Sequence, residues 1–136
     1  MLGGAEHAQA AESPAPCPTT GHAIREFGPT STGFHYGLDI ANAIGTPIKA
    51  GLAGRVTYSG TSGALGKYIM VTHSDATKTV YGHLWKHSVA LGTAVSGTTK
   101  IGEMGATGTT HGRAQLHLEV INEERINPRQ KYKCPQ

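Results

Sequence analysis

The chain has 136 residues, a formal net charge of +3 and a charged fraction of only 15%. This length is enough for one domain with a modest core and excludes two. The cationic residues are scattered, which argues against a nucleic-acid interface, and no apolar stretch is long enough to span a bilayer. The apolar residues occur in short runs interrupted by glycine, which favours short strands over helices.

The two ends of the chain differ from the middle. Residues 1–16 are rich in alanine, glutamate and proline, and we expect them to form a disordered leader that precedes one domain at residues 17–136. The leader lacks a basic segment followed by an apolar one, so no intact signal peptide is expected. Cys17 and Cys134 bracket the domain. A bridge between them would stabilise it by up to about 4–5 kcal/mol and would indicate an oxidising compartment. The alternative is two free thiols; we expect the bridge.

Short segments bounded by glycine or polar turns are predicted as strands, in chain order: residues 46–50, 54–58, 67–73, 78–84, 89–95, 100–104 and 115–121. No stretch has a helical period of more than a turn or two. The sequence therefore predicts a mainly β, antiparallel domain with its functional motifs at strand ends or in adjoining loops.

The connections between these strands suggest their pairing. The first two segments are separated only by residues 51–54 and are predicted to form a hairpin-like pair. The third and fourth are joined by a turn at residues 74–77 and should also pair. Residues 59–66 and 105–112 are expected to be loops.

Three distant segments each offer a histidine in a setting that suits metal chemistry: residues 35–39, 81–84 and 115–119. On the last of these, Gln115, His117 and Glu119 share one face of a strand, while the intervening apolar residues face the core. On a straight strand His35 and Asp39 would lie about 13 Å apart, but a glycine between them permits a bend. Each histidine alone is also compatible with an ordinary surface residue. If the segments converge, two imidazoles and a carboxylate would suit a hydrolytic zinc ion.

In their surroundings these segments closely resemble the LytM/lysostaphin-type zinc peptidases, in order from Gly21 to Pro128. The resemblance is carried by residues 34–40, 45–50, 54–56, 71–73, 79–84, 101–102, 116–119 and 125–128. It implies a small antiparallel β-sheet domain of the LytM type, built on a duplicated hybrid motif, with a groove for a peptide of the bacterial cell wall.

Carried over by position, the resemblance implies that His35, Asp39 and His117 bind Zn²⁺ and that His83 is catalytic. The family's last motif is HxH, and Gln115 occupies its first position here. Glutamine cannot exchange protons near neutral pH, but its amide can donate a hydrogen bond. We therefore expect Gln115 to position the substrate carbonyl or the attacking water.

For several neighbouring residues the sequence allows two roles. His111, in the preceding loop, could swing into the place of the missing histidine or remain a solvated loop residue. Glu119 could orient a ligand histidine or simply be exposed. Matching Gly112 to the family's glycine requires one additional residue before the strand, either Arg113 or Ala114.

We therefore expect a secreted, periplasmic or cell-wall zinc metalloendopeptidase that hydrolyses peptide bonds of peptidoglycan cross-links or bridges, acting as a monomer on peptidoglycan peptides. The alternative is a catalytically impaired relative that binds peptidoglycan or regulates another cell-wall hydrolase. A biotinyl- or lipoyl-type carrier domain is least favoured, because Lys49 and Lys67 lack the expected surroundings.

Overall fold

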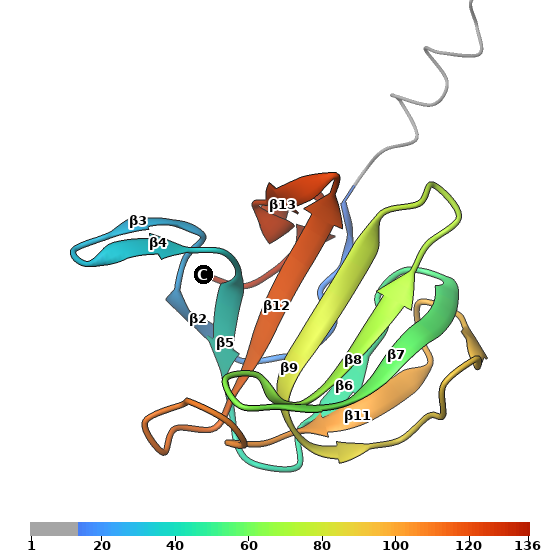
Figure 1. Cartoon of the computed structure of the whole chain (residues 1–136), viewed down its shortest axis with the longest axis horizontal. Helices are drawn as coiled ribbons and strands as arrows, with labels where there is room; N and C mark the ends of the chain where they lie inside the picture. The colour runs from blue at the N-terminus through green and yellow to red at the C-terminus, as the bar shows by residue number, and fades with distance from the viewer. Residues whose placement is uncertain (1–13) are drawn as a thin grey trace, which may run out of the picture.

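The computed structural model describes residues 14–136, and its regular structure is almost entirely β (Figure 1). The strands are β1 (Ala15–Pro16), β2 (His22–Arg25), β3 (Gly28–Thr30), β4 (Gly33–His35), β5 (Leu38–Ala41), β6 (Pro47–Lys49), β7 (Gly54–Ser62), β8 (Gly66–Thr72), β9 (Lys78–His87), β10 (Ala94–Val95), β11 (Lys100–Met104), β12 (Gln115–Asn122), β13 (Glu124–Ile126) and β14 (Tyr132–Lys133). One 3₁₀ helix, η1, spans Pro128–Gln130. The mainly β prediction is confirmed. No helix in this described part is long and apolar enough to cross a membrane.

The central sheet has the strand order β10-β7-β8-β9-β12-β5-β2, and each of its neighbouring pairs is antiparallel. Strand β11 pairs antiparallel with both β9 and β6, so β6 is joined to the sheet through β11. In Figure 1 the β3–β4 hairpin projects away from this sheet, next to β5. The apolar core is formed by side chains from β5 to β9, β11 and β12, including Leu38, Ile48, Val71, Ile101 and Leu118.

Strand β12 has one face toward the core and one polar face, as its alternating sequence predicts. Leu116, Leu118 and Val120 are buried in the core. Across the sheet, His117 lies opposite Asp39 of β5 on one side and opposite Gly82 of β9 on the other. Because directly opposite residues share a face, the sheet register alone places Asp39 beside His117.

Three local predictions are wrong. The hairpin between residues 46–50 and 54–58 does not form, because β6 pairs with β11 whereas β7 pairs with β8 and β10. The chain turns away between β6 and β7 at Gly51, whose φ of 81° suits glycine. Residues 59–66 are not all loop, since β7 continues to Ser62 and only residues 63–65 form the turn. Of residues 89–95, only Ala94–Val95 are in a strand.

The two ends of the described chain are joined. Cys17 and Cys134 form a disulfide across a sequence separation of 117 residues, which confirms the predicted bridge. Strand β1 pairs in parallel with β14, so the folded part already includes Ala15 and Pro16, two residues before the expected boundary. Residues 1–13 of the expected leader lie outside the described residues.

Candidate metal centre and groove

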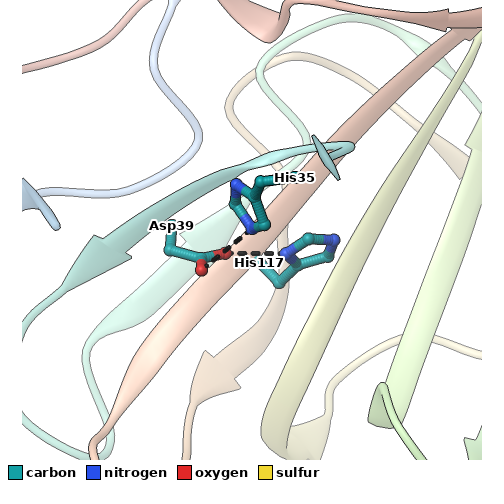
Figure 2. A group of neighbouring side chains, drawn as sticks. All are labelled: His35, Asp39 and His117. Atoms are coloured by element: carbon teal, nitrogen blue, oxygen red, sulfur yellow. Dashed lines mark hydrogen bonds and ion pairs between the residues drawn. The ribbon is translucent and has the colours of Figure 1, made fainter. Parts of the chain in front are cut away.

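Two histidines and an aspartate from distant parts of the chain meet on the polar face of the sheet (Figure 2). Nε2 of His35 lies 3.1 Å from Oδ2 of Asp39, and Nδ1 of His117 lies 2.7 Å from Oδ1 of the same carboxylate. Their potential ligand atoms all lie within 4.8 Å of one another. The structure therefore brings together the three residues that the sequence predicted as zinc ligands.

The bend that closes the distance between His35 and Asp39 lies at Gly37, between β4 and β5. A Cβ atom on Gly37 would lie only 2.7 Å from Cε1 of His117 and 2.6 Å from the carbonyl oxygen of Leu118. Real Cβ contacts this short do not occur, so any other residue would push the β4–β5 connection away from β12. Gly37 is thus required for the close approach of these segments.

Hydrogen bonds orient both imidazoles. Nδ1 of His35 lies 3.0 Å from the carbonyl oxygen of Glu26; since a carbonyl only accepts, Nδ1 carries the proton and Nε2 is left for a ligand. Nε2 of His117 lies 2.9 Å from a carboxylate oxygen of Glu119, which also accepts a hydrogen bond from Arg125. Glu119 is only 9% exposed. Of its two expected roles, the geometry therefore matches that of a residue that orients a ligand histidine.

The electrostatics of the cluster favour a positively charged His117 ring between the carboxylates of Asp39 and Glu119. Burial would raise the pKa of Asp39, but hydrogen bonds from His117 and His35 outweigh it and lower the pKa to about 2. Burial would lower the pKa of His117, but its bonds to Asp39 and Glu119 outweigh it and raise the pKa to about 9. The donor set of two imidazoles and one carboxylate fits a zinc ion, which would take the place of the proton on Nδ1 of His117.

His83 reaches the same site through a β-bulge in β9. Residues Lys67 and Ile69 of β8 lie opposite Leu84 and Tyr81, so β9 carries one additional residue here. His83 has a φ of 63°, the left-handed conformation that re-aims a bulged side chain. Its backbone N–H donates to the carbonyl of Leu65, and its Nδ1 donates to the carbonyl of Thr107 at 2.8 Å.

The environment of His83 suits a proton acceptor. Its ring centroid lies 5.8 Å from that of His117, and burial lowers its pKa from the ordinary value of 6.5. Because Nδ1 carries the proton toward the Thr107 carbonyl, Nε2 has the free lone pair. A neutral imidazole with a free nitrogen beside a metal centre can take up a proton.

Gln115 begins β12 beside this cluster and is 7% exposed. Its amide nitrogen is directed at the preceding loop, 3.2 Å from the carbonyl oxygen of Arg113 and 3.5 Å from that of Thr110. The amide donor therefore has loop carbonyls as partners, and the expected role in positioning a substrate stays a prediction. His111 is exposed at the surface of the same loop.

The cluster lies in a groove of about 430 Å³, and the groove also contains residues that the sequence reasoning missed. The lining residues are Arg25, His35, Asp39, Ser62, Ala64, Leu65, His83, Thr109, Thr110, His111, Gln115, His117, Glu119 and Arg125. Arg25 was missed because only the pairing of β2 with β5 places it opposite Asp39. Arg125 could have been suspected from the sequence, because it is the first residue of the segment 125–128 that resembles the family.

An antiparallel β domain with this His-Asp-His cluster in a groove belongs to the LytM/lysostaphin class. The sequence model described as Peptidase family M23 matches residues 33–128, and the chain belongs to this family.

Similar proteins of known sequence include enzymes and an activator. The chain is 39% identical over 95 residues to "DD-carboxypeptidase/endopeptidase Mpg" of Neisseria meningitidis, which covers 69% of this chain and 22% of that protein. It is 36% identical over 113 residues to "Murein hydrolase activator NlpD" of Salmonella typhimurium, which covers 82% of this chain and 29% of that one. The chain thus spans less than a third of the length of these relatives.

Solved structures share the fold. The catalytic domain of the antimicrobial peptidase lysostaphin from Staphylococcus simulans superposes with a TM-score of 0.73 at 30% identity, covering 79% of this chain and 88% of that one. A zinc-containing peptidase from Vibrio cholerae gives a TM-score of 0.78 at 27% identity, covering 91% of this chain and 41% of that one.

Proposed function

We propose that this protein is a zinc-dependent peptidase that hydrolyses peptide bonds of bacterial peptidoglycan. The observation that carries the proposal is the convergence of His35, Asp39 and His117, whose donor atoms lie within 4.8 Å of one another in an open groove. Membership of Peptidase family M23 and the similarity to "DD-carboxypeptidase/endopeptidase Mpg" support the reaction class.

In this proposal Nε2 of His35, a carboxylate oxygen of Asp39 and Nδ1 of His117 hold the zinc ion. Bound zinc would supply Lewis-acid polarisation of the scissile carbonyl and lower the pKa of water at the open position. His83 accepts and returns a proton through Nε2, while the Thr107 carbonyl holds its ring in place. Glu119 keeps His117 oriented toward the metal.

The test is a digestion assay on purified sacculi, with zinc content measured on the same protein sample. We expect about one zinc per chain and release of new amino groups from the sacculi, and we expect the release to be lost with a chelator and in His83→Ala. Exposed Lys49 lies outside the groove, so Lys49→Ala is a matched control that should digest normally. Release that persists at full rate with chelator would overturn the proposal.

A second candidate is a catalytically impaired protein that binds peptidoglycan or regulates another hydrolase. Two observations favour it: Gln115 lies where the family motif has histidine, with its amide donor bonded to loop carbonyls, and one similar protein is named a murein hydrolase activator. Gln115→His separates the candidates. A large gain of hydrolysis would favour the impaired protein, whereas measurable starting activity without a gain would favour the enzyme.

We also propose that the protein acts outside the cytoplasm, on peptidoglycan peptides and as a monomer. The disulfide between Cys17 and Cys134 supports an oxidising compartment. A similar protein of Haemophilus influenzae is named "Outer membrane antigenic lipoprotein B". Fractionation of the producing cells, with the disulfide state read by thiol labelling, tests the location.

A further inference from the structure

The metal-centre groove continues into a second hollow on the side of β2. This hollow has a volume of about 350 Å³ and is lined by Ile24, Arg25, Asp39, Thr110, His111, Arg113 and Gln115. It shares Arg25, Asp39, Thr110, His111 and Gln115 with the groove around the metal centre. A bound peptide can therefore extend from the metal centre into this hollow, which we call the β2 branch.

The β2 branch is lined by unpaired positive charge. Arg25 and Arg113 are both exposed, and within residues 14–136 neither side chain forms an ion pair or a hydrogen bond. By contrast, Arg125 and Arg129 are paired with Glu119 and Glu26. The one carboxylate that lines the branch is that of Asp39, whose two oxygens already lie within 3.1 Å of the imidazole nitrogens of His35 and His117. The two arginines therefore lack a compensating anion within this hollow.

The two arginines are brought to the branch by different structural means. Arg25 lies on β2 directly opposite Asp39, and such opposed Cα atoms are about 4.5–5.5 Å apart. Arg113 lies on the loop that precedes β12, where its own carbonyl accepts a hydrogen bond from Gln115. The same amide also contacts the Thr110 carbonyl, so Gln115 holds both ends of the segment that carries Arg113.

We propose that Arg25 and Arg113 form a subsite that binds a free carboxylate of the peptide substrate. Guanidinium groups bind carboxylates through paired, charge-assisted hydrogen bonds. Because Arg25 is opposite Asp39, the recognised carboxylate lies within about two or three residue lengths of the scissile bond. This inference rests on the proposed function. It selects stem peptides, which carry free carboxylates, over bridges of uncharged residues such as glycine.

The test uses the full zinc-loaded chain carrying His83→Ala, which should keep the peptides intact, and NMR titration with three synthetic stem peptides. One peptide has all its carboxylates free, the second ends in a carboxamide, and the third carries a side-chain carboxamide instead. We expect one amidated peptide to bind more weakly than the free acid, which identifies the recognised carboxylate. Arg25→Ala or Arg113→Ala should each weaken binding of the free acid about tenfold, and leave binding of that amidated peptide unchanged.

Lys49→Ala removes the same charge from an exposed position outside the groove, so it should preserve the preference for the free acid. Equal binding of all three peptides, or no binding, would overturn the subsite. A preference for the free acid that survives when both Arg25 and Arg113 are replaced by alanine would also overturn the subsite, because the zinc ion alone would then cause that preference. Hydrolysis of the same peptides is measured separately. Arginine-dependent binding without cleavage would refute the proposed reaction alone, and cleavage without carboxylate preference would refute the subsite alone.

Discussion

The two sides of the groove are held in different ways. On the side that we call the metal wall, the side chains of His35, Asp39, His117 and Glu119 contact one another through ion pairs and hydrogen bonds, continued by the ion pair of Glu119 with Arg125. On the side that we call the loop wall, residues 105–115, side chains are held mainly by backbone carbonyls, as the amide of Gln115 shows.

This difference matches what the proposed functions of the two walls require. A metal centre needs its donor atoms fixed within tenths of an ångström, and interlocked side chains on paired strands provide that precision. A surface that selects among peptides needs exposed groups that are free to bind the ligand. Arg113 is exposed and could provide such a group. Substitutions in each wall test whether the two walls are separable.

Removing a donor from the metal wall should have the largest effect. His117→Ala removes one of three donors, and we expect zinc affinity to fall by a factor on the order of 10³, about a third of a typical binding free energy. Competition with a chromophoric chelator measures the affinity. Gln115→Ala, on the loop wall, is the control and should bind zinc normally. Equal losses in both variants would show that the walls are not separable.

His83 should separate catalysis from metal binding. His83→Ala should lower hydrolysis by about 10²–10⁴-fold and leave zinc content unchanged. The imidazole must be neutral to accept a proton, so activity is lost as pH falls through its pKa. Because burial lowers the pKa of His83 below 6.5, the acid limb of the wild-type pH profile should lie below pH 6.5. A limb above this value would contradict the assignment.

Replacing Glu119, the outer carboxylate of the metal wall, should have an intermediate effect on zinc affinity. Glu119→Gln weakens the hydrogen bond that orients His117, and we expect zinc affinity to fall about 10–100-fold. Glu124, on β13, is exposed and lines no part of the groove, so Glu124→Gln is the matched control. An affinity for zinc unchanged by Glu119→Gln would show that the ring of His117 is oriented by packing alone.

The loop wall should respond locally when Gln115 is truncated. Gln115→Ala removes the side-chain contacts to the carbonyls of Thr110 and Arg113, with an expected loss of about 1 kcal/mol in unfolding free energy. Amide hydrogen exchange should become faster in residues 110–114 and remain unchanged in β5. Exchange that is unaltered in the loop would indicate that other bonds hold this wall.

Asp75 lies outside both walls and serves as a reference for how much an ionised, hydrogen-bonded carboxylate contributes to the free energy of unfolding. Asp75 accepts hydrogen bonds from Thr77, which lower its pKa from 3.8 to about 2. The stabilisation is therefore present above pH 3.8 and is lost as pH falls toward 2. After discounting for exposure, Asp75→Asn should cost about 1 kcal/mol at pH 7. Denaturant unfolding at pH 7 and pH 2 tests this: a loss that is equal at both values would exclude the ionised carboxylate as its source.

The sequence alone determined the features that depend on local pattern. Alternation along residues 115–121 identified β12 and its polar face, and the turn at residues 74–77 identified the pairing of β8 with β9. The placement of the two cysteines predicted the bridge that joins the domain's ends. The spacing of His35 and Asp39 around a glycine, with the family resemblance, named the three residues of the metal cluster.

The tertiary structure decided what depends on contacts between distant strands. The pairing of β6 with β11, and of β2 with β5, joins segments that no local signal connects, which is why the hairpin prediction failed and Arg25 was missed. The bulge that turns His83 into the groove requires a register that two strands set together. The partners of Gln115 are backbone carbonyls, and such groups are present in every residue, so their use as acceptors appears only when the loop is folded in space.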